Sequence, residues 1–159
     1  MVNFESRPSR RLTLMLLAAA SLSPISSIQA AEESFITIHK DPNCGCCSGW
    51  ARHLQKNGFV TKIIETLQPD AVKRRLGVPD DLASCHTAEI AGYIVEGHVP
   101  AAAVKRLLAE KPVAKGLAVA GMPVGSPGME GGQPERYDVV LFGPSERRVY
   151  MRFIGERQI

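Results

Sequence analysis

Three cysteines occupy four consecutive positions, Cys44-Gly45-Cys46-Cys47, and no other feature constrains the chain as strongly. The preceding residues 34–39 alternate and are β-branched, which predicts a half-buried strand. Asp41-Pro42-Asn43 then interrupts the pattern, and Asn43 is the predicted helix N-cap. Apolar residues follow at the spacing of one helix face, at Cys47, Trp50, Ala51 and Leu54. The cluster is therefore expected between a strand and the first turn of a helix.

The remaining chain alternates between strand-like and helix-like segments. Asn57-Gly58 predicts the end of the first helix, and a second strand is expected over residues 59–64. The later elements are predicted in this order: a short helix starting at Pro69 and closing at Gly77, a polar loop over 80–87, a strand over 90–95, a helix from Pro100 ending before Pro112, a glycine-rich loop over 116–132, and strands over 137–142 and 149–154 joined as an antiparallel hairpin. The pattern predicts an α/β fold.

The first thirty residues read as a segment removed on export. Arg7, Arg10 and Arg11 precede an apolar run over residues 12–22, and small residues follow at Ala30 and Ala31. This order is typical of a secretory signal peptide, and the apolar run is too short to cross a bilayer. We expect a signal peptide over residues 1–30 and cleavage after Ala30; the alternative is an N-terminal membrane anchor.

Removal of that segment leaves residues 31–159, which is enough chain for a single domain with one core. The segment carries three Arg and one Glu, so the net charge of +3 falls to +1. The remaining chain has no basic stripe interleaved with aromatic residues, which argues against nucleic-acid binding. It also has no second apolar segment of membrane-spanning length. The sequence predicts a soluble protein in an oxidising compartment.

Four cysteines in a small exported domain raise the alternative of two structural disulfides. The spacing argues against that alternative, because cysteines that join distant segments are spread along the chain. Cys44 and Cys47 also form a C-x-x-C pair at a helix start, where unpaired N–H groups and the helix dipole favour thiolates. This pair is the expected redox pair if the protein exchanges disulfides. Cys46 and Cys85 exceed what such an exchanger needs.

Thiolates are soft ligands that suit Cu(I) or Zn(II). Zinc sites usually draw four separated ligands from two pairs, whereas a contiguous Cys-x-Cys-Cys segment favours sulfurs that bridge several ions. We therefore expect copper, with more than one ion, in preference to zinc. His86 adjoins Cys85, and Met122 and Met129 add thioether sulfur within the glycine-rich loop. On pattern alone, His39, His53 and His98 are expected to be structural or surface residues, and His53, on the first helix, is expected to face solvent.

Several long motifs resemble the CopG-like periplasmic copper-resistance proteins, a family long described as a domain of unknown function. The similarity covers nearly all of residues 35–143. The motifs are Asp41-Pro42-Asn43-Cys44-Gly45-Cys46-Cys47-Ser48-Gly49-Trp50, Cys85-His86-Thr87, Gly92-Tyr93-Ile94-Val95-Glu96-Gly97-His98-Val99-Pro100, and Gly121-Met122-Pro123-Val124-Gly125-Ser126-Pro127-Gly128-Met129.

The resemblance implies a thioredoxin-like sandwich, with a central mixed β-sheet, flanking helices and a C-terminal β-hairpin. It also implies a periplasmic or otherwise exported protein with a cysteine-bridged, multinuclear copper site, and it raises a role in interconverting copper oxidation states. The implied ligands are Cys44, Cys46, Cys47, Cys85, His86, Met122, Met129 and His98. Met122-Pro123 resembles the segment that carries a cis-proline in thioredoxin-like proteins.

Three functions remain open at this stage. The first is an exported copper-binding protein of copper resistance, whose partners are copper ions and other periplasmic copper-handling proteins. The second is a thiol–disulfide oxidoreductase that uses Cys44 and Cys47. The third is a small structural domain held by two disulfides. Whether the protein is an enzyme is left open, because no substrate pocket can be identified from the sequence.

Overall fold

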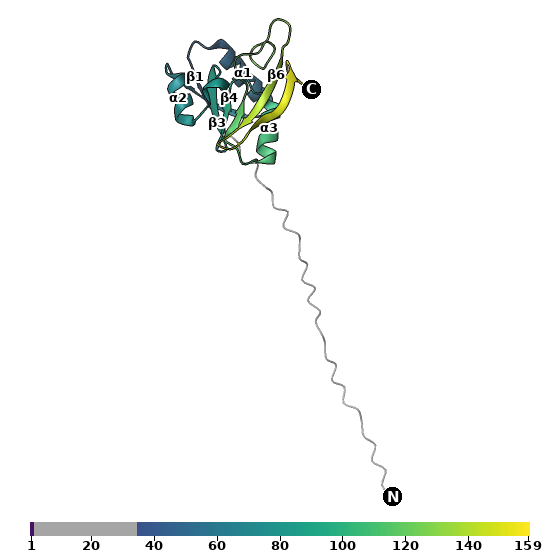
Figure 1. Ribbon diagram of the computed structural model, residues 1–159. Helices are drawn as coiled ribbons and strands as arrows, with labels where there is room; N and C mark the ends of the chain where they lie inside the picture. The colour runs from purple at the N-terminus through teal and green to yellow at the C-terminus, as the bar shows by residue number, and fades with distance from the viewer. Residues whose placement is uncertain (2–34) are drawn as a thin grey trace. The chain divides into compact units, whose positions relative to one another are not determined.

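The computed structural model describes residues 35–159 together with Met1. The predicted signal peptide and its cleavage site fall on residues outside this part and stay predictions. Figure 1 shows the elements, which follow in this order: β1 (Phe35–Lys40), α1 (Gly45–Lys56), β2 (Val60–Glu65), α2 (Pro69–Leu76), the 3₁₀ turn η1 (Asp80–Leu82), β3 (His86–Ile90), β4 (Tyr93–Glu96), α3 (Ala101–Glu110), β5 (Gly116–Ala118), β6 (Arg136–Phe142), β7 (Arg147–Ile154) and β8 (Arg157–Gln158).

One eight-stranded sheet contains all the strands, in the order β2-β1-β3-β4-β5-β6-β7-β8. The pairs β1–β2 and β4–β5 are parallel, and the other neighbours are antiparallel. The predicted mixed α/β class is therefore confirmed, as is the hairpin formed by β6 and β7. The helices of the described part are too short or too polar to cross a bilayer.

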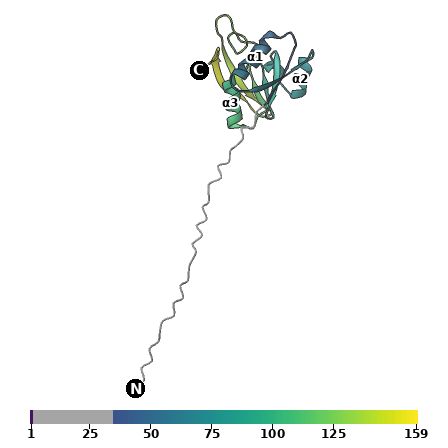
Figure 2. The ribbon, with the colours of Figure 1, turned by 180° about the vertical axis from the view of Figure 1, so that it is seen from behind.

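Helices cover both faces of the sheet. Neighbouring residues of a strand point to opposite faces, and β4 shows the division, because Val95 joins the larger core and Ile94 the smaller one. The larger core takes in Trp50 and Leu54 of α1 and Leu107 of α3. The smaller core contains residues of α2 and η1. Thus α1 and α3 pack on one face, where Figure 2 shows them in front of the sheet, and α2 packs on the other.

The helix ends follow from local chemistry. Pro69 occupies the first turn of α2, and the helix closes at Gly77, whose φ of 69° suits a residue without Cβ. The α3 helix begins after Pro100 and ends at Lys111, also in the left-handed region, immediately before Pro112. Both helices begin and end where the sequence predicts.

Several chain ends meet at one edge of the sheet. The last residue of β1, Lys40, pairs with the first residue of antiparallel β3, His86. The last residue of β4, Glu96, lies beside Thr87 on one side and beside Ala118, the end of β5, on the other. The segments that leave β1, β4 and β5, and the segment that enters β3, therefore share this edge.

The predicted strand over 90–95 is wrong in detail, because two strands replace it. Ile90 pairs with Tyr93 across a two-residue turn, and both turn residues, Ala91 (φ 47°) and Gly92 (φ 82°), have positive φ. This is the backbone that tight hairpins require. As a consequence, the predicted polar loop over 80–87 ends earlier, and His86 and Thr87 belong to β3.

Two expectations about the glycine-rich segment also need correction. Its first residues, Gly116–Ala118, form β5, because Leu117 fills the larger core between β4 and β6. The Met122–Pro123 peptide is trans, like every other peptide bond of the described residues, so the resemblance to the cis-proline segment of thioredoxin-like proteins does not extend to this peptide bond.

The packing of α1 predicts unequal effects along its length. Leu54→Ala should lower the free energy of unfolding by about 2–5 kcal/mol, because Leu54 is fully buried and its truncation leaves a cavity. Lys56→Ala, at an exposed position in the last turn, should change it by no more than about 0.5 kcal/mol. Chemical denaturation of both variants measures the difference, and equal losses would contradict this packing.

Candidate metal centre

The cysteine cluster lies at the N-terminus of α1, and a sulfur caps the helix. Cys44 is the N-cap residue, and its Sγ accepts the N–H of Cys47 at 3.3 Å. The prediction of Asn43 as the cap is wrong, because the Asn43 N–H instead donates to Asp41 Oδ1 at 2.8 Å in the turn before the helix. The first turn has no acidic residue, so the side-chain cap at this positive end of the helix dipole is a sulfur rather than a carboxylate.

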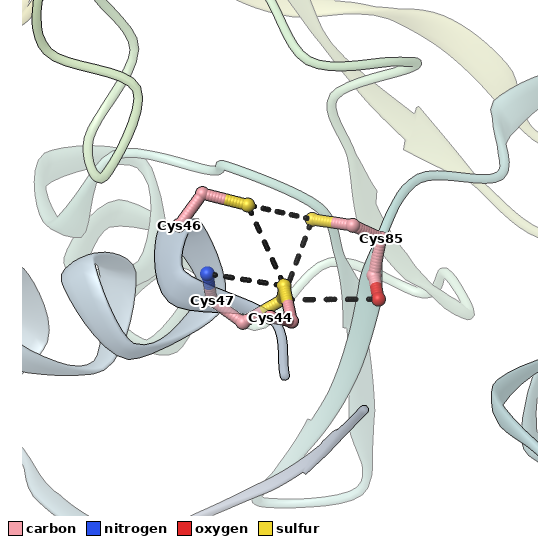
Figure 3. Close-up of side chains that lie close together, drawn as sticks. All are labelled: Cys44, Cys46, Cys47 and Cys85. Carbon is pink, nitrogen blue, oxygen red and sulfur yellow. Dashed lines mark hydrogen bonds between the residues drawn. A yellow bond between two sulfur atoms is a disulfide. The ribbon is translucent and has the colours of Figure 1, made fainter. Parts of the chain in front are cut away.

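The four sulfurs form one group. Cys44 and Cys47 are joined by a disulfide, whereas Cys46 and Cys85 are free thiols. Cys46 Sγ lies 3.5 Å from Cys44 Sγ and 3.7 Å from Cys85 Sγ, and Cys85 Sγ lies 3.6 Å from Cys47 Sγ. Figure 3 shows Cys85 reaching the helix start from the segment that enters β3. Cys46 and Cys85 thus meet although they are 39 positions apart, because β1 ends at the sheet edge where β3 begins.

His98 faces the sulfur of Cys85 with an unprotonated nitrogen. Its Nδ1 lies 2.8 Å from the Pro127 carbonyl, which can only accept, so Nδ1 carries the proton. In the neutral ring, Nε2 then holds a lone pair and lies 3.1 Å from Cys85 Sγ. A carbonyl that fixes the far nitrogen of an imidazole is the usual arrangement around a metal-ligating histidine.

His86 is fully buried and approaches the same sulfur. Its Nδ1 lies 3.3 Å from Cys85 Sγ, and its ring stacks 4.4 Å from Trp50, centroid to centroid. His86 Nε2 has no hydrogen-bond partner among the described residues. The unpartnered Nε2 and the Nδ1 that faces the thiol are different atoms of the ring, and only Nδ1 is placed to donate to a metal held by Cys85. Cys85, His86 and His98 offer three donor atoms within 4.8 Å of one another.

Burial keeps these groups uncharged. It raises the pKa of the Cys85 thiol to about 12, and the nearby Cys46 adds to the effect. Burial also holds the pKa of His86 well below 6.5, with smaller effects from His98 and Lys73, and it lowers the pKa of His98. At neutral pH Cys85 is therefore a protonated thiol beside two neutral imidazoles, which are ready to donate electron pairs.

The loop between β5 and β6 packs on the cluster. Gly128 lies against the backbone of α1, so closely that a Cβ there would meet the Cys46 carbonyl and the Trp50 nitrogen. This packing sets the adjacent Pro127 carbonyl against His98. Met129 follows at once and is half-buried, whereas Met122 is 52 % exposed. Both methionines belong to this loop, and their role as ligands stays a prediction.

The other two histidines have structural roles. His39 Nε2 lies 2.9 Å from Glu89 Oε1 on the sheet face opposite α1, in accord with the structural role expected for it. The expectation that His53 faces solvent is wrong, because its Nε2 accepts the N–H of Ala101 at 3.1 Å and so caps the start of α3. Neither residue belongs to the groups of possible metal-binding side chains found in the described part.

Polar residues behind Cys85 also support the site, and none of them was predicted from the sequence. Glu96 Oε1 accepts the N–H of Ser84 at 2.7 Å and lies 3.1 Å from Lys73 Nζ, and both charged residues are buried. The available signal was the acidic residue that ends the apolar run Tyr93-Ile94-Val95. A charge inside a strand pattern usually has a buried partner.

Fold and site define a class of protein: a mixed α/β domain whose sheet edge gathers thiols and imidazoles into a candidate centre for a soft metal. Two solved structures of a copper resistance protein, CopG form 1 and form 2, are similar to the chain. Form 1 is 47% identical with a TM-score of 0.73, covering 78% of this chain and 100% of its own. Form 2 is 46% identical with a TM-score of 0.72, covering 77% and 99%.

The chain belongs to the CopG copper-resistance family, so the resemblance seen in the motifs is confirmed. Residues 82–129 also match the family model described as a protein of unknown function, DUF411. A comparison with curated proteins finds no match.

Gly128 supplies a test of the loop. Gly128→Ala should detach the loop from α1 and speed hydrogen exchange of its amides, because the new Cβ would meet backbone and φ is +86°. Gly131→Ala is the matched control, since Gly131 has a φ of +108° but open space around its Cβ position. Exchange rates that rise equally in both variants would contradict this packing, because they would show that the positive φ, and not the contact with α1, causes the change.

Neutral buried His86 gives a pH dependence of stability. Its folded pKa is depressed, so the unfolded chain binds the extra proton and stability falls as the pH drops below about 6.5. Between pH 6 and 5, the metal-free wild type should lose up to about 1.4 kcal/mol more per pH unit than metal-free His86→Phe. Denaturant titrations across this range measure both slopes. Parallel slopes would mean that His86 is protonated in the fold.

Proposed function

We propose that the protein binds Cu(I) through Cys44, Cys46, Cys47 and Cys85, with more than one ion per chain. The observation that carries the proposal is the grouping of these four sulfurs, which all lie within 4.8 Å of one another. Four thiolates so close repel one another strongly unless cations separate them. Soft monovalent copper suits these donors, and sulfurs that bridge neighbouring ions would satisfy several coppers at once.

The copper resistance named in the relatives supports copper over zinc. The donor set supports it as well, because His98 and His86 add borderline nitrogen donors beside Cys85, and Met122 and Met129 supply thioether sulfur from the adjacent loop. Three of the four sulfurs come from one turn, whereas a structural zinc site usually draws its ligands from two separated pairs.

Thiol redox change is part of this proposal. The disulfide between Cys44 and Cys47 leaves only two free thiols, so full copper binding requires its reduction. A dithiol reductant would pass two electrons and two protons to this bond, giving two thiols while the reductant itself becomes a disulfide. Oxidation of the same pair would withdraw two ligands. Copper content would therefore follow the redox poise of the compartment.

We place this function outside the cytoplasm, in the periplasm or another exported location. The predicted signal peptide supports this location, and a disulfide in a small domain is typical of oxidising compartments. Other exported copper-handling proteins are the proposed partners, because Cu(I) would reach and leave the cluster by ligand exchange.

We also infer that the part of the fold from β1 to α3 is thioredoxin-like. Three observations support this inference: the strand order β2-β1-β3-β4, a parallel β1–β2 pair joined through α1, and helices on both sheet faces. The C-x-x-C pair at the start of α1 is consistent with it. Strands β5 to β8 would then be an extension of the sheet beyond β4.

The second candidate function is thiol–disulfide exchange. It is favoured by the free Cys85 thiol 3.6 Å from Cys47 Sγ, a short approach to a disulfide. An exchange enzyme would reduce a protein disulfide with turnover, and Cys46→Ser would keep that activity. A copper protein would show no turnover, and the same substitution would lower its copper content.

A Cu(I) titration tests the proposed function. Fully reduced wild type, loaded without oxygen, should bind more than one copper per chain in native mass spectrometry. Cys46→Ser should bind at least one ion fewer, because Cys46 Sγ lies between Cys44 and Cys85 and would bridge their metals. Ser48→Ala, in the same helical turn, removes no sulfur and should keep the wild-type content.

The oxidation state of the chain supplies the control. Protein that keeps the Cys44–Cys47 disulfide should bind less copper than the reduced chain. Reduced wild type that binds no copper, or that prefers zinc in equal competition, would contradict the proposal.

A further inference from the structure

Three polar side chains that all contact one another lie behind Cys85, on the sheet face away from α1. Glu96 Oε2 accepts the hydroxyl of Thr87 at 2.6 Å, and Glu96 Oε1 lies 3.1 Å from Lys73 Nζ. Lys73 Nζ also donates to Thr87 Oγ1 at 3.2 Å. The network joins α2, β3 and β4, and none of its members belongs to the candidate metal centre.

The burial of this network is costly and calls for a reason. Glu96 is fully buried, and the Lys73 side chain is 8% exposed. A buried ion pair is often no more stabilising than apolar residues of the same size, so its presence suggests a role in fixing local geometry. The smaller apolar core beside it, with Leu76 and Leu82, shows that apolar side chains fill the same face.

The geometry that the network fixes is that of Cys85. Glu96 Oε1 accepts the backbone N–H of Ser84, one residue before the thiol, and Oε2 holds the Thr87 side chain, two residues after it. Ser84 Oγ in turn donates to the Gly121 carbonyl, beside Met122. One carboxylate therefore holds the segment on both sides of Cys85 and, through Ser84, the start of the loop between β5 and β6.

We propose that Glu96, supported by Lys73, is a positioning residue that keeps Cys85 Sγ within bonding reach of Cys46 and Cys47. The inference rests on the proposed function, since it concerns the geometry of the same site. Without an acceptor at Glu96, the Ser84 N–H would lose its partner at a half-buried position, and the segment between η1 and β3 would shift toward water to satisfy it. The distance of 3.7 Å between Cys46 Sγ and Cys85 Sγ would then lengthen.

Two matched double variants separate the effect of the hydrogen bond from Ser84 to Glu96 from the effect of the buried charges. Lys73→Met with Glu96→Gln removes the ion pair but keeps an oxygen that accepts from Ser84. Lys73→Met with Glu96→Met removes the acceptor at nearly the same side-chain volume. Neither variant leaves an unpaired buried charge, so both should fold. Thermal melting of the reduced proteins checks this directly.

The measurement is the effective concentration of Cys46 toward Cys85, in a Cys44→Ser/Cys47→Ser background. At equilibrium with glutathione, the two thiols form one disulfide while oxidised glutathione becomes two reduced molecules. The Gln variant should keep the effective concentration measured in this background with Lys73 and Glu96 intact. The Met variant should show at least a tenfold lower value, which corresponds to a reduction potential about 30 mV less negative. The same measurement on Cys44 and Cys47, in a Cys46→Ser/Cys85→Ser background, should be unchanged.

Equal values for the Gln and Met variants would overturn the positioning role. A parallel fall for the Cys44–Cys47 pair would overturn it too, because that pair lies within the start of α1 and reports general loosening. With all four cysteines present, the Met variant should bind Cu(I) about 10–100-fold more weakly than the Gln variant. If wild type binds no Cu(I), the proposed function fails, while the glutathione equilibrium still decides on Glu96.

Discussion

Antiparallel pairing of β3 with β1 is the constraint on which the rest of the site depends. Because Lys40 lies opposite His86, the residue before β3 comes to the edge of the sheet from which α1 starts. Cys85 therefore meets the cysteines of the helix start, although it lies 39 positions after Cys46. A slip of one residue in this register would turn His86 away from Trp50 and carry Thr87 into the larger core. The apolar residues of β3, Ala88 and Ile90, prevent that slip, since both belong to the larger core.

The alternation of side chains in β3 places the candidate metal ligands on one face of the sheet and the buried charged residues on the other. His86 points to the face of α1 and contacts Trp50, whereas Thr87 points to the face of α2 and binds Glu96. Sulfur and imidazole thus gather on one side of the sheet, and the buried charges lie on the other. The backbone next to Cys85 connects them, because Ser84 donates its N–H to Glu96. Charge can therefore fix the position of a thiol without lying beside it.

The sequence predicts those parts of the molecule that local patterns determine. The start of α2 at Pro69 and its end at Gly77 follow from single residues, and the cysteine cluster at the start of α1 follows from a helical repeat. The turn at Ala91-Gly92 was missed because apolar residues continue on both sides of it and conceal the break. The role of Glu96 was also beyond a local pattern. Its partners come from α2, β3 and the segment before β3, and only the folded sheet brings them together.

The buried groups of the site link folding to metal binding. Folding places a thiol whose pKa rises to about 12 and two neutral imidazoles in an environment from which water is largely excluded. His86 Nε2 has no hydrogen-bond partner in the described part of the chain, so the metal-free fold bears part of its desolvation cost. A cation that replaces the thiol proton would lower the cost of burying the Cys85 sulfur, and His86 Nδ1 and His98 Nε2 face the same sulfur as further donors. The buried thiol and the imidazole nitrogens that face it are thus the groups that would favour a bound soft metal.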